Sequence, residues 1–227
     1  MPIHANALVV MAKAPIPGSV KTRLMPFFSA PQAAALARAL LVDQLEHLRA
    51  LRNADLYLAF TPLRARRLIR RLTPTRFEIF PQRGGVDLGA RMQSIFATLF
   101  AKGYKRIVLI GGDLPPVPLS HFAQAFSYLD DPEPRAVLGP STDGGYYLIG
   151  LNRDQPELLD RMTWSHDQVL TQTLARLISL DIKSHLLPTW RDIDTIDDVR
   201  CLQSTLASMT AKTARKTLSF LRQIKQQ

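Results

Sequence analysis

The chain alternates short apolar segments with longer amphipathic ones, and this alternation limits the folds that it can adopt. Residues 8–11 and 106–110 are almost wholly apolar, as strands buried on both faces of a parallel sheet are. Segments between such strands place leucines at helical spacing, as at Leu36, Leu40 and Leu41. We predict strands at 8–11, 55–60, 77–80, 106–110, 136–138, 146–151 and 184–187, and helices at 31–52, 62–72, 89–102, 118–129, 165–180, after Thr195 and from about 210. This order predicts an α/β fold with a mostly parallel central sheet flanked by helices on both faces.

Chain length and cysteine content indicate the number of domains and the cellular compartment. The 227 residues favour one domain, 1–227, with a basic C-terminal helix at about 210–227, over two domains. Cys201 is the one cysteine, so an internal disulfide is excluded and a reducing cytoplasm is expected. Because Cys201 falls in a predicted apolar helix, we expect it in the core. No apolar run reaches the length of a membrane span, and no signal peptide is expected.

The net charge of +10 is concentrated in two segments. Five arginines fall within 64–71, five cations fall within 212–225, and no acidic residue follows Asp198. Neither segment interleaves aromatics with its cations as single-strand binders do, so nucleic acid is disfavoured as a partner and a solvated basic face is favoured. A non-catalytic nucleotide- or nucleic-acid-binding protein remains an alternative, and the oligomeric state is open.

The loop after the first strand combines glycine with cations. Gly18 lies in it, and Lys13, Lys21 and Arg23 flank or follow it. A loop of this kind at the end of a parallel strand is where α/β proteins bind phosphate, although a proline-rich turn with solvated cations would show the same residues.

Carboxylates follow two later segments. Asp113 comes after the apolar strand and Gly111-Gly112, while Asp192 and Asp194 precede the helix that Thr195 is predicted to cap. Asp113 and Asp194 would suit Mg²⁺ or Mn²⁺, which bind carboxylate oxygens and keep sites for water and phosphate. A turn or helix-capping role is the alternative for each.

Two further glycine-bearing loops are candidates. Asp143-Gly144-Gly145 between two strands is first a hairpin signal, but Asp143 could contact a sugar hydroxyl or an acceptor. In the loop 82–92, Asp87 and Arg91 surround Gly89 and could contact a base or ribose, or simply begin a helix.

Taken together, these motifs resemble the DUF2064 family. The resemblance covers about residues 8–202 and rests on A-K-A-P-x-P-G-x-V-K-T-R-L, D-L-G-x-R-M, G-G-D-x-P, D-G-G-Y-Y-L-I-G and D-I-D-T. Family members are described as glycosyltransferase-like, as radical SAM- or selenodomain-associated transferases, or as arsenosugar-biosynthesis glycosyltransferases. The family belongs to the nucleotide-diphospho-sugar transferase superfamily, which has the GT-A fold and includes guanylyltransferases.

The resemblance implies a role for each motif. The nucleotide would be bound by Lys13, Gly18, Lys21, Arg23, Asp87, Leu88, Gly89 and Arg91, the metal by Asp113 and Asp194, and the acceptor by Gly144, Gly145 and Tyr146. The partners would be an NDP-sugar or an NTP and a small-molecule acceptor.

Two reactions remain open at this point. Glycosyl transfer from an NDP-sugar would use Asp143 or Asp192 as general base, and nucleotidyl transfer from an NTP would place a phosphorylated acceptor against the α-phosphorus. Many GT-A glycosyltransferases carry D-x-D after the central strand, whereas this chain has Gly111-Gly112-Asp113, as the nucleotidyltransferases do. His166 departs from the expected threonine and receives no role.

Overall fold

The computed structural model describes residues 2–85, 87–208 and 213–224. Within them one sheet has seven strands in the order β3-β2-β1-β4-β6-β5-β7. The strands are β1 (Asn6–Lys13), β2 (Asp55–Thr61), β3 (Phe77–Pro81), β4 (Arg106–Gly111), β5 (Arg135–Pro140), β6 (Tyr146–Leu151) and β7 (Lys183–Leu186). Strand β6 pairs antiparallel with β4 and β5, and the other pairs are parallel. The predicted mostly parallel α/β sheet is confirmed.

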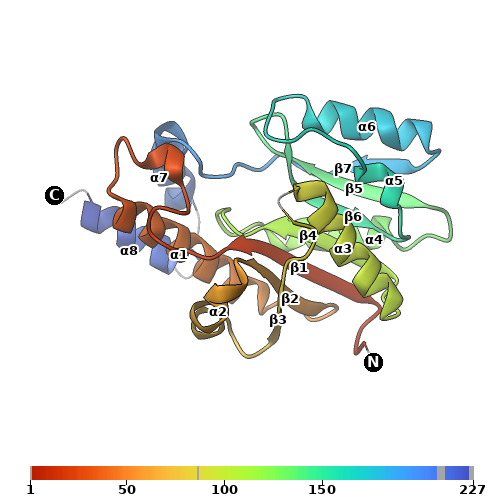
Figure 1. The fold of residues 1–227 in the computed structure, drawn as a ribbon, viewed down its shortest axis with the longest axis horizontal. Coiled ribbons are helices and arrows are strands. Elements are labelled where there is room, and N and C mark those ends of the chain that lie inside the picture. Colours follow the sequence, from red (N-terminus) through yellow and green to blue (C-terminus); the bar gives the residue numbers. More distant parts are fainter. Residues whose placement is uncertain (1, 86, 209–212, 225–227) are drawn as a thin grey trace.

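Helices cover both faces of this sheet (Figure 1). They are α1 (Ala30–Leu48), α2 (Arg66–Leu72), α3 (Leu88–Ala101), α4 (Leu119–Tyr128), α5 (Pro156–Leu159), α6 (Val169–Ser179), α7 (Ile196–Ser208) and α8 (Arg215–Ile224), with 3₁₀ turns at Thr22–Leu24 and Leu63–Ala65. A hydrophobic core lies on each face of the sheet, because successive side chains of β1 point to opposite faces. Leu8 and Val10 pack with α1, α2 and α4 on one face, while Ala7 and Val9 pack with α3, α5 and α6 on the other.

A third, smaller core lies where α1, α7 and α8 gather at one end of the molecule (Figure 1). It buries Leu24 of the first loop and Ile193 of the segment before α7, together with Leu36, Leu40, Leu202 and Phe220. Each of the two loop residues adjoins charged residues of the predicted site. The C-terminal helices therefore fix both loops by burying one apolar side chain from each.

Several local predictions need correction. Cys201 is exposed, because α7 turns Val199, Leu202 and Leu206 inward and Cys201 outward. Ser165 does not cap α6, which begins only at Val169; its φ of 67° instead places it in a turn. The short helix α5 was not predicted, since four residues give no periodic signal.

Other predictions hold. The amide of Asp198 donates to Thr195 Oγ1 at 3.2 Å, so Thr195 caps α7 as expected. Of the predicted basic helix at 210–227, residues 215–224 form α8, and 209–212 and 225–227 lie outside the described residues. In the described part of the chain, no helix is long and apolar enough to cross a membrane.

Asp43 anchors α8 to α1. Its buried carboxylate accepts from the amides of Lys216 at 2.9 Å and Thr217 at 2.7 Å, which are unpaired donors at the start of α8. We predict that Asp43→Ala lowers the free energy of unfolding by about 1–2 kcal/mol and speeds hydrogen exchange at residues 216 and 217. Glu46→Ala, which removes an exposed carboxylate one turn away, is the control. Unchanged exchange at 216 and 217 would contradict the anchoring role.

Candidate functional site

The centre of the site is a lysine between two aspartates. Lys21 Nζ donates to Asp113 Oδ2 at 2.8 Å and to Asp194 Oδ1 at 2.9 Å. The Lys21 side chain is only 3% exposed, while those of Asp113 and Asp194 are 47% and 39% exposed. Arg23 Nη1 lies 3.9 Å from Asp194 Oδ2. The structure thus brings together residues that the sequence predicts for phosphate binding and for metal binding.

Asp113 reaches this point because β4 passes very close to β1. A Cβ atom on Gly112 would lie 2.8 Å from the Ala12 Cβ and 3.1 Å from the Met11 carbonyl oxygen. Any larger residue at 112 would push the two strand ends apart. The glycine before Asp113 therefore permits the approach that turns the carboxylate toward the first loop.

Asp194 is held by the start of α7. The carboxylate of Asp198 accepts from the amides of Asp194 at 3.1 Å and Thr195 at 2.8 Å, and Arg191 Nη1 donates to it at 2.9 Å. Asp198 is a positioning residue that we did not predict. The spacing of Thr195 and Asp198, three residues apart at a helix start, is the capping-box signal that could have found it.

Lys21 and Asp113 hold each other in their charged forms. Burial alone would lower the pKa of the Lys21 ammonium, but the two carboxylates outweigh burial and raise the pKa above its usual value. Burial alone would raise the pKa of Asp113, but the charge and hydrogen bond of Lys21 lower it. A cation thus already lies between two aspartates.

The donor set fits a hard divalent cation. Among the described residues no three Asp, Glu, His or Cys side chains gather as a complete metal cage. Mg²⁺ and Mn²⁺ sites of nucleotide enzymes need only one or two carboxylates, since phosphates and water supply the other ligands. Asp113 and Asp194 meet this requirement, and the Lys21 ammonium marks where positive charge is stabilised.

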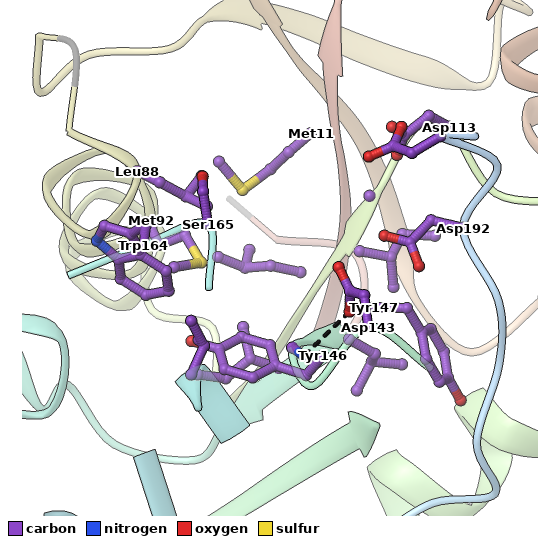
Figure 2. A pocket seen from close by; sticks show the side chains of 18 of the residues that line it. Met11, Leu88, Met92, Asp113, Asp143, Tyr146, Tyr147, Trp164, Ser165 and Asp192 are labelled. Atoms are coloured by element: carbon purple, nitrogen blue, oxygen red, sulfur yellow. Dashed lines mark hydrogen bonds between the residues drawn. The ribbon is translucent and has the colours of Figure 1, made fainter. Parts of the chain in front are cut away.

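Two cavities meet at these carboxylates and share Met11, Asp113 and Asp194 in their walls. The smaller cavity has a volume of about 220 Å³ and is lined by Lys13, Lys21 and the loop 19–22. The larger one, shown in Figure 2, has a volume of about 350 Å³. Ligand pockets in proteins have volumes of this order.

Two further aspartates line the larger cavity. Asp192 and Asp143 lie on the same side of it as Asp113 (Figure 2). The Ser141 hydroxyl donates to Asp192 Oδ1, and the Gly145 amide donates to Asp143 Oδ1 at 3.0 Å. Burial, and then the charges of Asp143 and Asp113, raise the pKa of Asp192 to about 6, although the Ser141 bond opposes this. Asp192 is thus a carboxylate that gains and loses a proton near neutral pH.

The segment that carries Asp192 is tied to the sheet. The Trp190 amide donates to the Pro140 carbonyl at 3.0 Å, and the Trp190 indole donates to the Pro115 carbonyl at 3.1 Å. These bonds join the end of β5 and the loop after Asp113 to the chain just before Asp192. Trp190 is a second positioning residue that local sequence patterns gave no reason to single out.

The hairpin between β5 and β6 forms as predicted, and Gly145 and Tyr146 line the larger cavity. Gly144 has a φ of 86°, and a Cβ there would lie 2.1 Å from the Asp167 carbonyl oxygen. The Gly144 carbonyl accepts from the Leu170 amide at 2.9 Å, so the hairpin packs against the start of α6. Gly144 therefore positions the loop and is not itself part of the cavity wall.

The turn before α6 also reaches the larger cavity. Trp164, Ser165 and His166 line it, although the sequence assigned His166 no role and placed Ser165 in a helix. Trp164 packs against Tyr146 edge to face with ring centroids 6.4 Å apart. No local pattern at 164–166 signals a cavity wall, because the contact depends on the packing of α6 against the hairpin.

The remaining predicted residues have mixed positions. Leu88 lines the larger cavity, but Asp87 caps α3 by accepting from the Gly89 amide at 2.8 Å. Arg91 Nε donates to the Gly85 carbonyl at 2.6 Å, which closes the loop on itself. Gly18 has a φ of 78° and shapes the first loop. Of these residues, the structure places only Leu88 in the wall of either cavity, and base or ribose binding by the others stays a prediction.

Comparison with known proteins identifies the family. The profile of DUF2064, described as an uncharacterized protein conserved in bacteria, matches residues 44–166, more than half of the chain. The chain belongs to the DUF2064 family. A crystal structure from Desulfovibrio desulfuricans G20, with the provisional description of nucleotide-diphospho-sugar transferase, is 30% identical with a TM-score of 0.87 and covers 97% of this chain and 95% of its own. No curated protein matches the chain.

More distant structures show the fold of this DUF2064 protein. A cytidylyltransferase from Leptospira borgpetersenii is 16% identical with a TM-score of 0.60, over 98% of this chain and 94% of that one. Rv0371c from Mycobacterium tuberculosis, crystallised with manganese, is 18% identical with a TM-score of 0.52, over 88% and 98%. The expected family and the nucleotide-diphospho-sugar transferase fold are confirmed, and two of these three structural relatives are described as transferases.

Lys21 and a metal ion would compete for the same two carboxylates. We predict that Lys21→Met raises the affinity of the nucleotide-free protein for Mn²⁺ roughly tenfold, because the carboxylates lose their bound ammonium, a change of about 1.4 kcal/mol. Calorimetry or the Mn²⁺ spin-resonance signal measures it. Lys102→Met is the control, since Lys102 lies over the Tyr57 ring away from both cavities. Unchanged or weaker Mn²⁺ binding by Lys21→Met would refute the competition.

Asp192 makes the stability of the metal-free protein depend on pH. Because its pKa is raised to about 6 in the folded state, the folded protein binds more protons than the unfolded chain between about pH 4 and 6, and stability falls as pH rises through this window. We predict that Asp192→Asn is more stable than the wild type at about pH 7.5, by on the order of 1 kcal/mol after allowance for solvent screening.

The same comparison at about pH 4 should show little difference, because the folded-state carboxyl is then neutral as well. Denaturant unfolding in the presence of a chelator measures the difference in stability between Asp192→Asn and the wild type at each pH. The exposed Asp154→Asn is the control. A gain that is equal at both pH values would show that the charge of Asp192 is not its cause.

Proposed function

We propose that this protein is a metal-dependent glycosyltransferase that moves a sugar from a nucleoside-diphosphate sugar to a small acceptor. One observation carries the proposal: a cavity that contains Lys13 and Lys21 and a cavity that contains Asp143 and Asp192 share Asp113 and Asp194 in their walls. A donor of this kind has an anionic diphosphate joined to an uncharged sugar. The cations of the smaller cavity complement the diphosphate in charge, and the carboxylates of the larger cavity can accept hydrogen bonds from sugar hydroxyls.

The smaller cavity would hold the diphosphate. Lys13 and Lys21 line it, and Arg23 Nη1 lies 3.9 Å from Asp194 Oδ2. The loop 19–22 adds backbone groups at the end of β1, where α/β proteins bind phosphate. Lys21 would leave Asp113 and Asp194 for the phosphates when a metal ion takes its position, so that ammonium and metal both oppose the charge of the donor.

The carboxylates of Asp113 and Asp194 would hold Mg²⁺ or Mn²⁺. When bound, the ion would neutralise the charge that develops on the departing diphosphate. The support from this chain is that both carboxylates point to one cationic group and remain 47% and 39% exposed, so they are open to exchange of that group.

The larger cavity would hold the transferred sugar and the acceptor. Asp192 or Asp143 would take the proton from the acceptor hydroxyl as that oxygen attacks the anomeric carbon. Asp192 is the better placed of the two in chemical terms, because a pKa of about 6 suits a base that works near neutral pH. A general base of this kind is what transfer with inversion at the anomeric carbon normally requires.

Nucleotidyl transfer is the second candidate. The single carboxylate of Gly111-Gly112-Asp113 favours it, as does the structural likeness to a cytidylyltransferase. In that reaction an acceptor phosphate would attack the α-phosphorus of an NTP, and pyrophosphate would leave. The two reactions differ in the released product: a nucleoside diphosphate for glycosyl transfer and pyrophosphate for nucleotidyl transfer.

A ligand panel tests the proposal. We predict that one NDP-sugar with Mn²⁺ or Mg²⁺ raises the melting temperature of the protein more than the matching NTP does, because ligands that bind the folded state stabilise it. Asp113→Asn should lose the metal-dependent part of this shift while its own melting temperature in the absence of ligand changes little.

Asp154→Asn, an exposed aspartate, is the matched control and should keep the full shift. A larger metal-dependent shift with an NTP, followed by release of pyrophosphate, would replace glycosyl transfer by nucleotidyl transfer. If no nucleotide shifts the melting temperature, both glycosyl transfer and nucleotidyl transfer are overturned.

A further inference from the structure

The charge of the larger cavity is opposite to that of the protein as a whole. The chain carries a net charge of +10, yet the described residues that line this cavity include four aspartates and no lysine or arginine. Lys21 offsets Asp113 and Asp194 from the side of the smaller cavity. Asp143 and Asp192 are the two carboxylates left facing the acceptor side.

Among the described residues, neither of these two aspartates has a charged hydrogen-bond donor. Asp192 accepts from the Ser141 hydroxyl and Asp143 from the Gly145 amide. Hydroxyl and amide donors satisfy an oxygen atom but do not remove its negative charge. The field inside the cavity is therefore negative on this side.

His166 lines the cavity but makes its hydrogen bonds within its own turn. Its Nδ1 accepts from the Gln168 amide at 3.1 Å, and its Nε2 lies 3.0 Å from Thr163 Oγ1 and 3.1 Å from the Thr163 carbonyl oxygen. Among the described residues, the bonds of His166 therefore go to Thr163 and Gln168 and not to Asp143 or Asp192.

The opposite wall is mostly apolar and aromatic, with Ser165 beside Leu88, Met92 and Trp164 (Figure 2). Met11, Trp164 and Leu88 lie across the cavity from Asp113 and Asp192, and Tyr146 forms its base (Figure 2). Aromatic and thioether groups pack well against apolar rings and chains, and aromatic faces also attract alkylammonium groups. The cavity thus offers carboxylates on one side and aromatic surface on the other.

We propose that the acceptor is an unphosphorylated molecule that bears a hydroxyl, is neutral or positively charged, and has an apolar or aromatic portion. This inference rests on the proposed function, because it assumes that the smaller cavity holds the donor phosphates. Asp143 and Asp192 bind its hydroxyl or ammonium groups, and the wall of Met11, Tyr146 and Trp164 packs against its carbon skeleton. A phosphate monoester would meet two uncompensated carboxylates there, and like charges placed together oppose binding.

Fractionated metabolites test the acceptor class. A small-molecule extract of bacterial cells is separated at neutral pH into an anion-exchange-bound fraction and an unbound, neutral or cationic fraction. Each fraction is incubated with the full chain, Mn²⁺ and the NDP-sugar that stabilises the protein best. Release of nucleoside diphosphate and the mass of the new glycoside are measured. We expect turnover with the unbound fraction.

Turnover only with the bound fraction, lost when that fraction is treated with phosphatase before the donor is added, would overturn the inference. Turnover with neither fraction would overturn it too, provided that the NDP-sugar still shifts the melting temperature. A protein that no nucleotide stabilises would instead mark failure of the proposed function, so the two failures are distinguishable.

Charge reversal supplies a second test. With an acceptor from the unbound fraction, Asp143→Lys should raise the KM for the acceptor at least tenfold. The thermal shift with Mn²⁺ and the nucleoside diphosphate of the donor should stay as in the wild type, because Asp143 does not line the smaller cavity that is proposed to hold the phosphates. Asp143→Asn should have a smaller effect of the same sign. Asp154→Lys changes the net charge equally at an exposed position and should leave the KM unchanged. An unaltered KM in Asp143→Lys would overturn the placement of the acceptor beside Asp143.

Discussion

The bridge from Lys21 to Asp113 and Asp194 is the interaction on which the site depends. It joins side chains that are 92 and 173 positions apart in the sequence, from the first loop, the end of β4 and the start of α7. Two carboxylates this close would repel each other without a cation between them. The lysine therefore assembles the site before any ligand arrives, and it does so with a charge that a metal ion can replace.

The geometry of this bridge is maintained by apolar packing behind it. Leu24, three residues after Lys21, and Ile193, next to Asp194, are buried in the small core of α1, α7 and α8. Asp43 fixes α8 to α1, and Asp198 fixes the backbone at Asp194. The C-terminal helices thus contribute to the site although none of the residues described in them lines either cavity. Their cations face away from this core, as Arg215, Lys216 and Arg222 are exposed.

Charge is separated across the bridge rather than spread evenly. Lys13 and Lys21 line one cavity, whereas Asp143 and Asp192 line the other. A substrate that is anionic at one end and uncharged at the other would be oriented by this field before any specific contact forms. The chain belongs to the DUF2064 family and has the nucleotide-diphospho-sugar transferase fold. In the function proposed above, this separation of charge would distinguish the side of the donor from the side of the acceptor.

The sequence by itself determined the sheet, the order of its elements and most of the charged residues near its edge, because apolar alternation, helix caps and glycine-bearing loops are local signals. It placed Lys21 with the phosphates and Asp113 and Asp194 with a metal, but it could not show that these three touch, since contacts between distant segments leave no local pattern. Trp190 and the turn at 164–166 were missed for the same reason, whereas Asp198 had a local signal in its capping-box spacing from Thr195. Cys201 was expected inside because the orientation of α7 depends on its neighbours. Only the packing of α7 and α8 against α1, and of α6 against the hairpin, decided which side chains meet at the two cavities.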